Sequence, residues 1–150
     1  MKVSECMTRE VRIVDPAETL EGAARVMADL DAGFLPVGEN DRLVGIITDR
    51  DIAIRAVGVG RPPDAKVRDV MSEEVRYCFV DDDVDDILEN MAELQVRRLP
   101  VVDRDKRLVG VVSIGDLASN GESARAGETL GDIVRPSALH SQILVSVTGK

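Results

Sequence analysis

Hydrophobic side chains recur with the spacing of a helix in two segments of this sequence. In each segment they lie at i, i+3, i+4 and i+7, which places them on one face of a helix. These positions are Leu20, Ala23, Ala24, Met27 and Leu30 in the first segment and Val84, Ile87, Leu88, Met91 and Leu94 in the second. Thr19 and Asp83 come just before the two runs, where an N-cap residue is expected. The pattern therefore predicts amphipathic helices over residues 20–30 and 84–94.

Short apolar runs after each predicted helix indicate strands. A Leu-Pro-Val sequence stands at residues 35–37 and returns, with one more valine, at residues 99–102. After a polar turn come residues 43–48 and 108–113, which are apolar almost throughout. Runs of this length and composition are typical of strands buried on both faces, and we expect that burial here. A weaker alternation at residues 11–14 predicts another strand ahead of the first helix.

The remaining segments divide into helix, linker and loop. Residues 51–57 begin a helix, and the Gly/Pro-rich stretch at 58–63 is predicted to be the linker that follows it. Residues 119–127 are small and polar, which predicts a loop. Residues 142–147 are apolar enough for a short strand or an ordered tail, and the sequence leaves that choice open.

These elements form two copies of one pattern. Equivalent residues lie 64 positions apart up to Val37 and Val101, and 65 positions apart from Leu43 and Leu108 onward, because the second copy has one inserted residue. An internal repeat of this kind predicts an α/β protein built from two tandem β-α-β-β-α repeats, related by a pseudo-twofold axis. Each repeat has only about 60 residues, which bury little surface alone, so we expect the two to share one core.

The repeat sets the expected domain boundaries. Residues 1–63 hold the first repeat, residues 64–120 hold the second, and residues 121–150 form a C-terminal extension. Each repeat starts with a short leader, because residues 3–8 are echoed by residues 67–72. Together the two repeats make one compact unit, as a length of 150 residues allows.

Charge and composition exclude several classes of partner. The formal net charge of −9 and pI near 4.6 argue against a surface that follows a phosphate backbone. Two Phe, one Tyr and no Trp leave little on which bases could stack. No apolar run approaches the roughly 20 residues of a membrane helix, and the N-terminus lacks the apolar core of a signal peptide. The sequence therefore favours a cytoplasmic protein that binds neither nucleic acid nor membranes.

Side chains suited to metal binding or nucleophilic catalysis are few. Cys6 and Cys78 form no CxxC motif, and His140 is the single histidine. A structural zinc site requires four such ligands, so we expect no metal site and no cofactor. The two cysteines are most simply buried apolar side chains in a reducing compartment. No nucleophile motif or orienting group accompanies His140, and we expect no catalytic residues.

A hydroxyl side chain stands three positions before an aspartate in both repeats, as Thr48 and Asp51 and as Ser113 and Asp116. Each pair lies where a predicted strand turns into a helix, a place that favours anions. A carboxylate there can accept hydrogen bonds from two ribose hydroxyls, as in dinucleotide-binding folds. The same spacing is an acidic variant of the helix capping box, whose role is purely structural. Both interpretations stay open at this point.

Taken together, these motifs resemble a pair of CBS motifs, the Bateman module. The resemblance covers about residues 1–120 and is clearest at residues 43–52 and 95–103. It implies an α/β module with two clefts between its repeats that bind adenosine-containing ligands such as AMP, ADP, ATP, related dinucleotides or S-adenosylmethionine. It further implies a non-catalytic regulatory sensor, a homodimer paired through its helices, and a regulated protein partner of unknown identity. The alternative is a dimerisation or partner-docking scaffold with empty clefts.

The resemblance also assigns roles to the two hydroxyl–aspartate pairs. Thr48 and Ser113 would meet the phosphate side of the ligand, while Asp51 and Asp116 would hold the ribose.

An arginine pair distinguishes the second repeat. Arg97 and Arg98 stand just before the Leu-Pro sequence, where the family often places basic phosphate contacts, whereas the first repeat has Gly33 and Phe34. By the resemblance, the pair would serve the cleft that carries Asp51; the alternative is that both are solvated residues at a strand edge. The expected ligand-binding residues are Thr48, Arg50, Asp51, Arg97, Arg98, Ser113 and Asp116.

Overall fold

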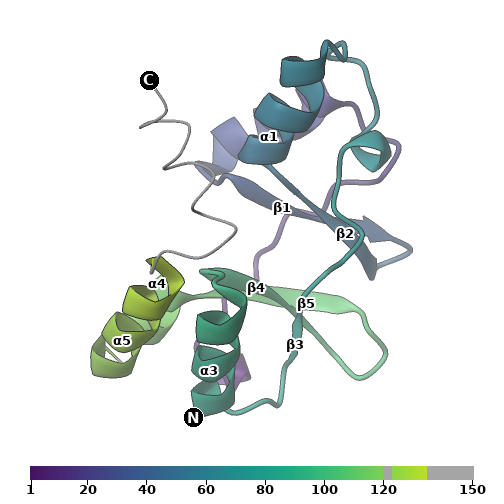
Figure 1. Ribbon diagram of the computed structural model, residues 1–150. Coiled ribbons are helices and arrows are strands. Elements are labelled where there is room, and N and C mark those ends of the chain that lie inside the picture. The colour runs from purple at the N-terminus through teal and green to yellow at the C-terminus, as the bar shows by residue number, and fades with distance from the viewer. Residues whose placement is uncertain (120–122, 135–150) are drawn as a thin grey trace, which may run out of the picture.

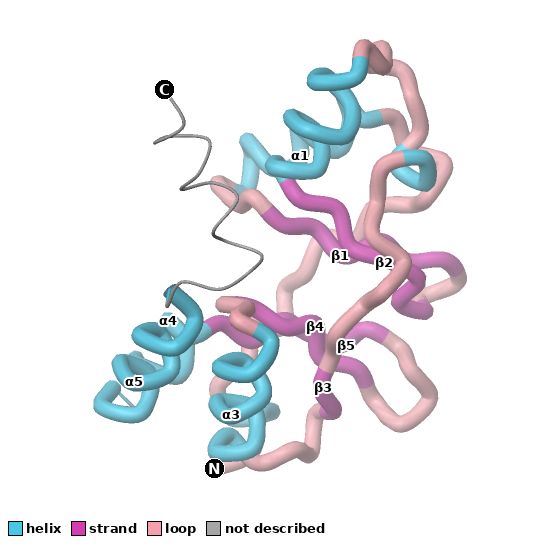
Figure 2. The backbone as a smooth tube through the Cα atoms, viewed as in Figure 1, coloured by secondary structure: helices cyan, strands magenta, loops and turns pink. Residues whose placement is uncertain are grey.

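Two α/β repeats face each other in the computed structural model, which describes residues 1–119 and 123–134 (Figure 1). The first repeat holds α1 (Leu20–Leu30), β1 (Phe34–Glu39) and β2 (Arg42–Thr48), and the second holds β3 (Cys78–Phe79), α3 (Val84–Leu94), β4 (Arg98–Val102) and β5 (Leu108–Ser113). The two sheets lie face to face between α1 on one side and α3 on the other (Figure 2). The molecule is thus layered helix, sheet, sheet, helix.

Both predicted amphipathic helices are confirmed at their predicted bounds. The Thr19 hydroxyl oxygen accepts a hydrogen bond from the Gly22 amide at 3.0 Å, and an Asp83 carboxylate oxygen accepts one from the Asp85 amide at 3.0 Å. Each side chain therefore satisfies one amide at a helix start that has no partner within the helix.

The predicted strands form an antiparallel hairpin in each repeat, β1 with β2 and β4 with β5. β3 adds a parallel strand to β4, but the strand predicted at residues 11–14 is reduced to a single bridge between Val14 and Val37. The reason is a proline. In the second repeat the Val80 amide donates to the Val102 carbonyl oxygen at 3.0 Å, whereas the equivalent residue in the first repeat, Pro16, has no N–H to donate.

The expectation that the central strands are buried on both sides is wrong for β2 and β5. Ile47 and Val112 are fully buried, whereas their neighbours Ile46 and Val111 are partly exposed. One face of each strand packs into a core, and the opposite face is turned toward the space between the repeats.

The two repeats are related by the predicted pseudo-twofold axis. Arg42 and Arg107 are equivalent residues, and they form an antiparallel bridge with each other. Residues can meet their own counterparts only next to such an axis, so the axis passes where β2 and β5 begin.

The expected single core is also wrong, because the described residues form two hydrophobic clusters, one per repeat. Each cluster is completed by the leader of the other repeat. Val3, Cys6 and Met7 pack in the cluster of the second repeat, and Val67, Val70 and Met71 pack in that of the first. The small repeats close their cores by exchanging leaders rather than by merging.

Backbone hydrogen bonds hold each exchanged leader in place. The Thr8 amide donates to the Val111 carbonyl oxygen at 2.8 Å, and the Ser72 amide donates to the Ile46 carbonyl oxygen at 2.8 Å. These bonds attach the first leader to β5 and the second to β2. The two repeats are therefore tied together by backbone pairing as well as by packing.

The C-terminal helix α5 (Ser123–Val134) replaces much of the loop predicted at residues 119–127. Ala126, Thr129 and Ile133 are buried, at i, i+3 and i+7, where α5 packs against α3. The Gln95 side-chain amide donates to the Asp132 carbonyl oxygen at 3.2 Å. The part of this face within the predicted loop holds only small residues such as Ala126, so the sequence showed no run of large apolar side chains there. Residues 142–147 lie outside the described residues.

Shorter helices follow the two hairpins. α2 (Asp49–Asp51) continues into a π-helix (Ile52–Ala56), which confirms the helix predicted there, and α4 (Ile114–Leu117) follows β5. Within the part of the chain that the structure describes, every helix is too short or too polar to cross a membrane.

Replacing Gly110 by alanine is expected to destabilise the protein by about 1–3 kcal/mol, because the new methyl group would collide with the first leader where it crosses β5. A Cβ atom there would lie 2.7 Å from the Thr8 carbonyl oxygen and 2.9 Å from the Met7 sulfur. Urea unfolding measures the free energy of unfolding. The control is Gly127→Ala on α5, where a Cβ meets nothing within 4 Å and alanine should stabilise the helix by about 0.5–1 kcal/mol. Equal changes in the free energy of unfolding in the two variants would contradict the close packing of the first leader against β5.

Candidate functional site

Two clefts lie on the faces that the repeats turn toward each other. The larger has a volume of about 1260 Å³ and is lined by five of the expected ligand-binding residues, Thr48, Arg50, Asp51, Arg97 and Arg98. The smaller has a volume of about 280 Å³ and is lined by Ser113, Asp116 and again Arg98. The structure thus brings the arginine pair into the cleft that carries Asp51, and it places the two aspartates in different clefts.

Both hydroxyl–aspartate pairs form reciprocal capping boxes. The Thr48 hydroxyl oxygen accepts from the Asp51 amide at 3.1 Å, and Asp51 Oδ2 accepts from the Thr48 amide at 3.0 Å. Ser113 and Asp116 repeat both bonds at 3.0 Å. The capping interpretation is therefore confirmed as local structure. It leaves the hydroxyl hydrogen of Thr48 and of Ser113 for donation elsewhere, because each cap uses only the hydroxyl oxygen.

The second carboxylate oxygen of Asp51 takes no part in the cap. Asp51 Oδ1 lies 3.8 Å from a guanidinium nitrogen of Arg55, in an ion pair too long to be a hydrogen bond. The Asp51 side chain is 20% exposed. An ionised carboxylate oxygen has lone pairs for more than one donor, so Asp51 can hold its helix start and still accept hydrogen bonds in the cleft.

Three residues of the larger cleft escaped the sequence analysis. Ser72, Glu74 and Arg76 follow the second leader and line this cleft. Their counterparts Thr8, Glu10 and Arg12 line the smaller cleft. A pattern of hydroxyl, any residue, Glu, Val, Arg stands at both places. This repetition in the sequence could have identified the three residues as candidate site residues. It was missed because the leader exchange, which carries these residues to the opposite repeat, is a long-range contact.

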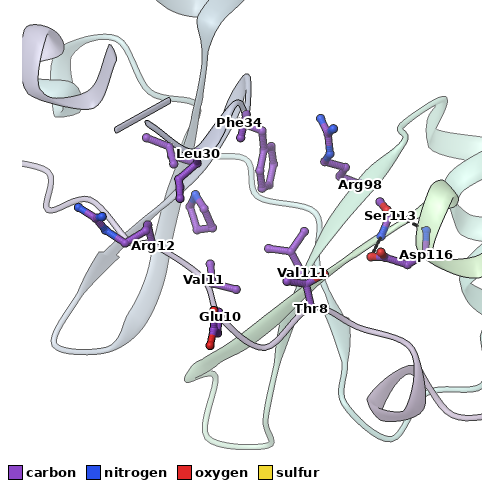
Figure 3. Close-up of a pocket in the computed structure, with 13 residues that line it drawn as sticks. Thr8, Glu10, Val11, Arg12, Leu30, Phe34, Arg98, Val111, Ser113 and Asp116 are labelled. Atoms are coloured by element: carbon purple, nitrogen blue, oxygen red, sulfur yellow. Dashed lines mark hydrogen bonds between the residues drawn. The ribbon is translucent and has the colours of Figure 1, made fainter. Parts of the chain in front are cut away.

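The smaller cleft has an apolar wall. Figure 3 shows Leu30 and the ring of Phe34 on one side, facing Ser113 and Asp116 on the other. Phe34 and Arg98 are equivalent residues, and each lines both clefts. Phe34 and Arg98 therefore lie at the boundary between the two clefts.

The charges that line the clefts also differ. Among the described residues, four arginines and three carboxylates line the larger cleft, and two of each line the smaller. The larger set comprises Arg50, Arg76, Arg97, Arg98, Asp49, Asp51 and Glu74. In a chain whose net charge is −9, this small excess of arginine makes the larger cleft locally more favourable to an anion than the smaller one.

The two cysteines are buried free thiols, as predicted. Burial raises the pKa of the Cys78 thiol to about 12, and burial, followed by the nearby Asp116 charge, raises the pKa of Cys6. Both therefore stay protonated at neutral pH, and the thiolate is the nucleophilic form. Across residues 1–119 and 123–134, His, Cys, Asp and Glu form no group of three that could hold a metal ion. His140 lies outside these residues.

Comparison with known families and sequences gives one consistent result. A family model described as "CBS domain" matches residues 3–58 and 67–122. The chain is 41% identical over 132 residues to the "CBS domain-containing protein YhcV" of Bacillus subtilis (strain 168), an alignment that covers 87% of this chain and 94% of that protein.

Solved structures agree. The crystal structure of Hypoxic Response Protein I with two coordinated zinc ions is 36% identical, with a TM-score of 0.72, and the match covers 80% of this chain and 98% of that one. The cytosolic domain of the Mg²⁺ channel MgtE in complex with ATP is 29% identical, with a TM-score of 0.69. That match covers 79% of this chain and 48% of the MgtE chain.

Proposed function

The chain belongs to the CBS-domain family, and from this premise we propose that it is a non-catalytic regulatory module that binds an adenosine-containing ligand between its repeats. The observation that carries the proposal is the larger cleft, where a hydroxyl, an aspartate and arginines from both repeats come together. The ATP complex of the related MgtE cytosolic domain supports the ligand class.

Each group in the larger cleft has a distinct proposed role. The Asp51 carboxylate accepts hydrogen bonds from the two ribose hydroxyls through the oxygen that the cap does not use. The Thr48 hydroxyl hydrogen is donated to the first phosphate. Arg97 and Arg98 are exposed side chains at the start of β4, and they bind phosphate oxygens through charge-assisted hydrogen bonds. Ser113 and Asp116 supply the same hydroxyl and carboxylate groups to the smaller cleft.

Ligand occupancy would reach a partner protein through relative movement of the repeats. Residues from both repeats line each cleft, so a bound ligand bridges the two and favours one arrangement of them. A ligand can shift such an equilibrium only by its difference in affinity for the two arrangements.

A thermal-shift panel tests the proposal. Adenosine, AMP, ADP, ATP and S-adenosylmethionine are each titrated until the melting temperature shows saturation at about 100 times the apparent dissociation constant or no change at all, with GTP as the control. A bound ligand at this excess stabilises the fold by about 2.7 kcal/mol, which for a chain of this size raises the melting temperature by roughly 5–10 °C. A scaffold with empty clefts shows no shift with any adenylate. Chromatography of the recovered ligand shows whether it is consumed, which would instead indicate an enzyme.

We also propose a homodimer, because the first repeat leaves apolar side chains uncovered. Leu30 on α1 is 45% exposed, and Ile54, Val57 and Val59 after α2 are 51%, 70% and 67% exposed. Closed twofold symmetry is the commonest outcome for identical chains. Light scattering should give twice the chain mass of 16.3 kDa. A monomeric mass across about 1–100 μM, the range of ordinary reversible association, would contradict the dimer.

A further inference from the structure

We propose that the two clefts take different ligands: the larger binds one adenosine di- or triphosphate per chain, with Arg76 as a specificity-determining residue, and the smaller binds no phosphorylated adenosine. This inference rests on the proposed function, since it divides the adenosine-binding role unequally between two clefts that the repeat makes equivalent in position.

Size separates the clefts first. The larger cleft, at about 1260 Å³, has more than four times the volume of the smaller, at about 280 Å³. Pockets for drug-sized ligands occupy about 300–1,000 Å³, so the smaller cleft falls just below that range and the larger exceeds it. On volume, the larger cleft is the better fit for a nucleoside with two or three phosphates.

Substitution at equivalent positions accounts for part of the difference. Arg97 lines only the larger cleft, and its counterpart Gly33 has no side chain to offer the smaller one, whereas Arg98 and its counterpart Phe34 line both clefts. The Phe34 ring lies within the smaller cleft, opposite Ser113 (Figure 3). An aromatic ring there takes up space and offers no charge to a phosphate.

Arg76 adds a basic group from a third segment of the larger cleft. Arg98 begins β4 and Arg97 directly precedes it, and Arg50 lies in α2, while Arg76 follows the exchanged leader. Guanidinium groups match phosphate geometry with paired donors. Several of them from separate segments can surround a chain of phosphates, which a single phosphate would not require.

The equivalent residue Arg12 is a natural control. It lines the smaller cleft, where Figure 3 shows it across the cleft from Ser113 and Asp116 and on the side of Leu30. Only one other arginine, Arg98, lines that cleft among the described residues. Arg12 and Arg76 thus have the same sequence context but different numbers of basic neighbours.

Isothermal titration of the full chain with ATP, ADP and adenosine tests the inference. We expect one ATP per chain. Arg76→Gln should weaken ATP and ADP by about tenfold, which corresponds to one lost charge-assisted contact, and should leave adenosine affinity unchanged. Arg12→Gln should leave all three affinities within about twofold of wild type. Circular dichroism and ligand-free melting of both variants verify that each is folded.

Two ATP molecules per chain, or equal losses in Arg76→Gln and Arg12→Gln, would overturn the inequality of the clefts while the proposed function stands. A loss confined to Arg12→Gln would place the nucleotide in the smaller cleft and overturn the inference as well. If wild type binds neither adenosine nor its phosphates, the proposed function itself fails, and the inference fails with it.

Discussion

Replacing Asp51 by alanine is expected to weaken binding of adenosine ligands at the larger cleft by at least about tenfold. The change removes charge-assisted hydrogen bonds to the ribose, each worth about 1.5–3 kcal/mol, and each 1.4 kcal/mol is about tenfold in affinity. Because every ligand of the class carries the ribose, adenosine should lose as much affinity as ATP. Titration calorimetry with both ligands measures the loss.

Alanine also removes half of a capping box, so Asp51→Asn is the necessary companion. The asparagine carbonyl oxygen can still accept from the Thr48 amide, which preserves the helix start, while the charge that strengthens the ribose contacts is gone. Asn should therefore reproduce most of the loss in affinity with little loss of stability. Asp116→Ala removes the same local cap in the other repeat. Unchanged affinities in both alanine variants, with the fold intact, would remove the aspartates from the proposed site.

Double replacement of Arg97 and Arg98 by glutamine is expected to weaken nucleotides while sparing adenosine. Each arginine contributes charge-assisted contacts of about 1.5–3 kcal/mol where it reaches a phosphate, so the loss should be about tenfold or more for ADP and ATP. The loss should grow from adenosine to AMP to ADP, because each added phosphate gives the arginines more negative charge to bind. The dependence of affinity on salt concentration should flatten in the variant.

A matched pair of substitutions separates local contacts from total charge. Arg61 and Arg68 are exposed and line neither cleft, and changing both to glutamine alters the net charge by the same amount. This control should bind ADP and ATP as wild type does. If instead the Arg97 and Arg98 variant keeps the wild-type preference among adenosine and its phosphates, the two are surface charges and the scaffold alternative gains support.

Local patterns predicted local structure well. Helices α1 and α3 and their caps follow from hydrophobic spacing and from one side chain before each run, because a helix satisfies its own backbone. The hairpins follow from short apolar runs joined by a polar turn. The strand predicted before α1 does not form because Pro16 has no amide hydrogen to donate. The second repeat has Val80 at this position and forms the strand, so the two copies differ there.

Local patterns could not predict contacts between segments that are distant in the sequence. The pairs Thr48–Asp51 and Ser113–Asp116 were found because each is complete within four residues. The contribution of Arg76 depends on a leader that crosses to the opposite repeat, and nothing within the leader itself specifies where it binds. The buried face of α5 could not be predicted either, because Ala126 and Thr129 are buried only once α5 packs against α3 and α4.

The leader exchange has a consequence for how the protein is made. Val3, Cys6 and Met7 complete a core whose other members reach as far along the chain as Ile133, whereas the first repeat can close as soon as Met71 has been synthesised. At about 5–20 residues per second, the first leader waits on the ribosome for seconds, with its apolar side chains exposed, after its own repeat has begun to fold. This leader is made before the rest of the core that it completes, and deleting it would damage the distal repeat rather than the one beside it.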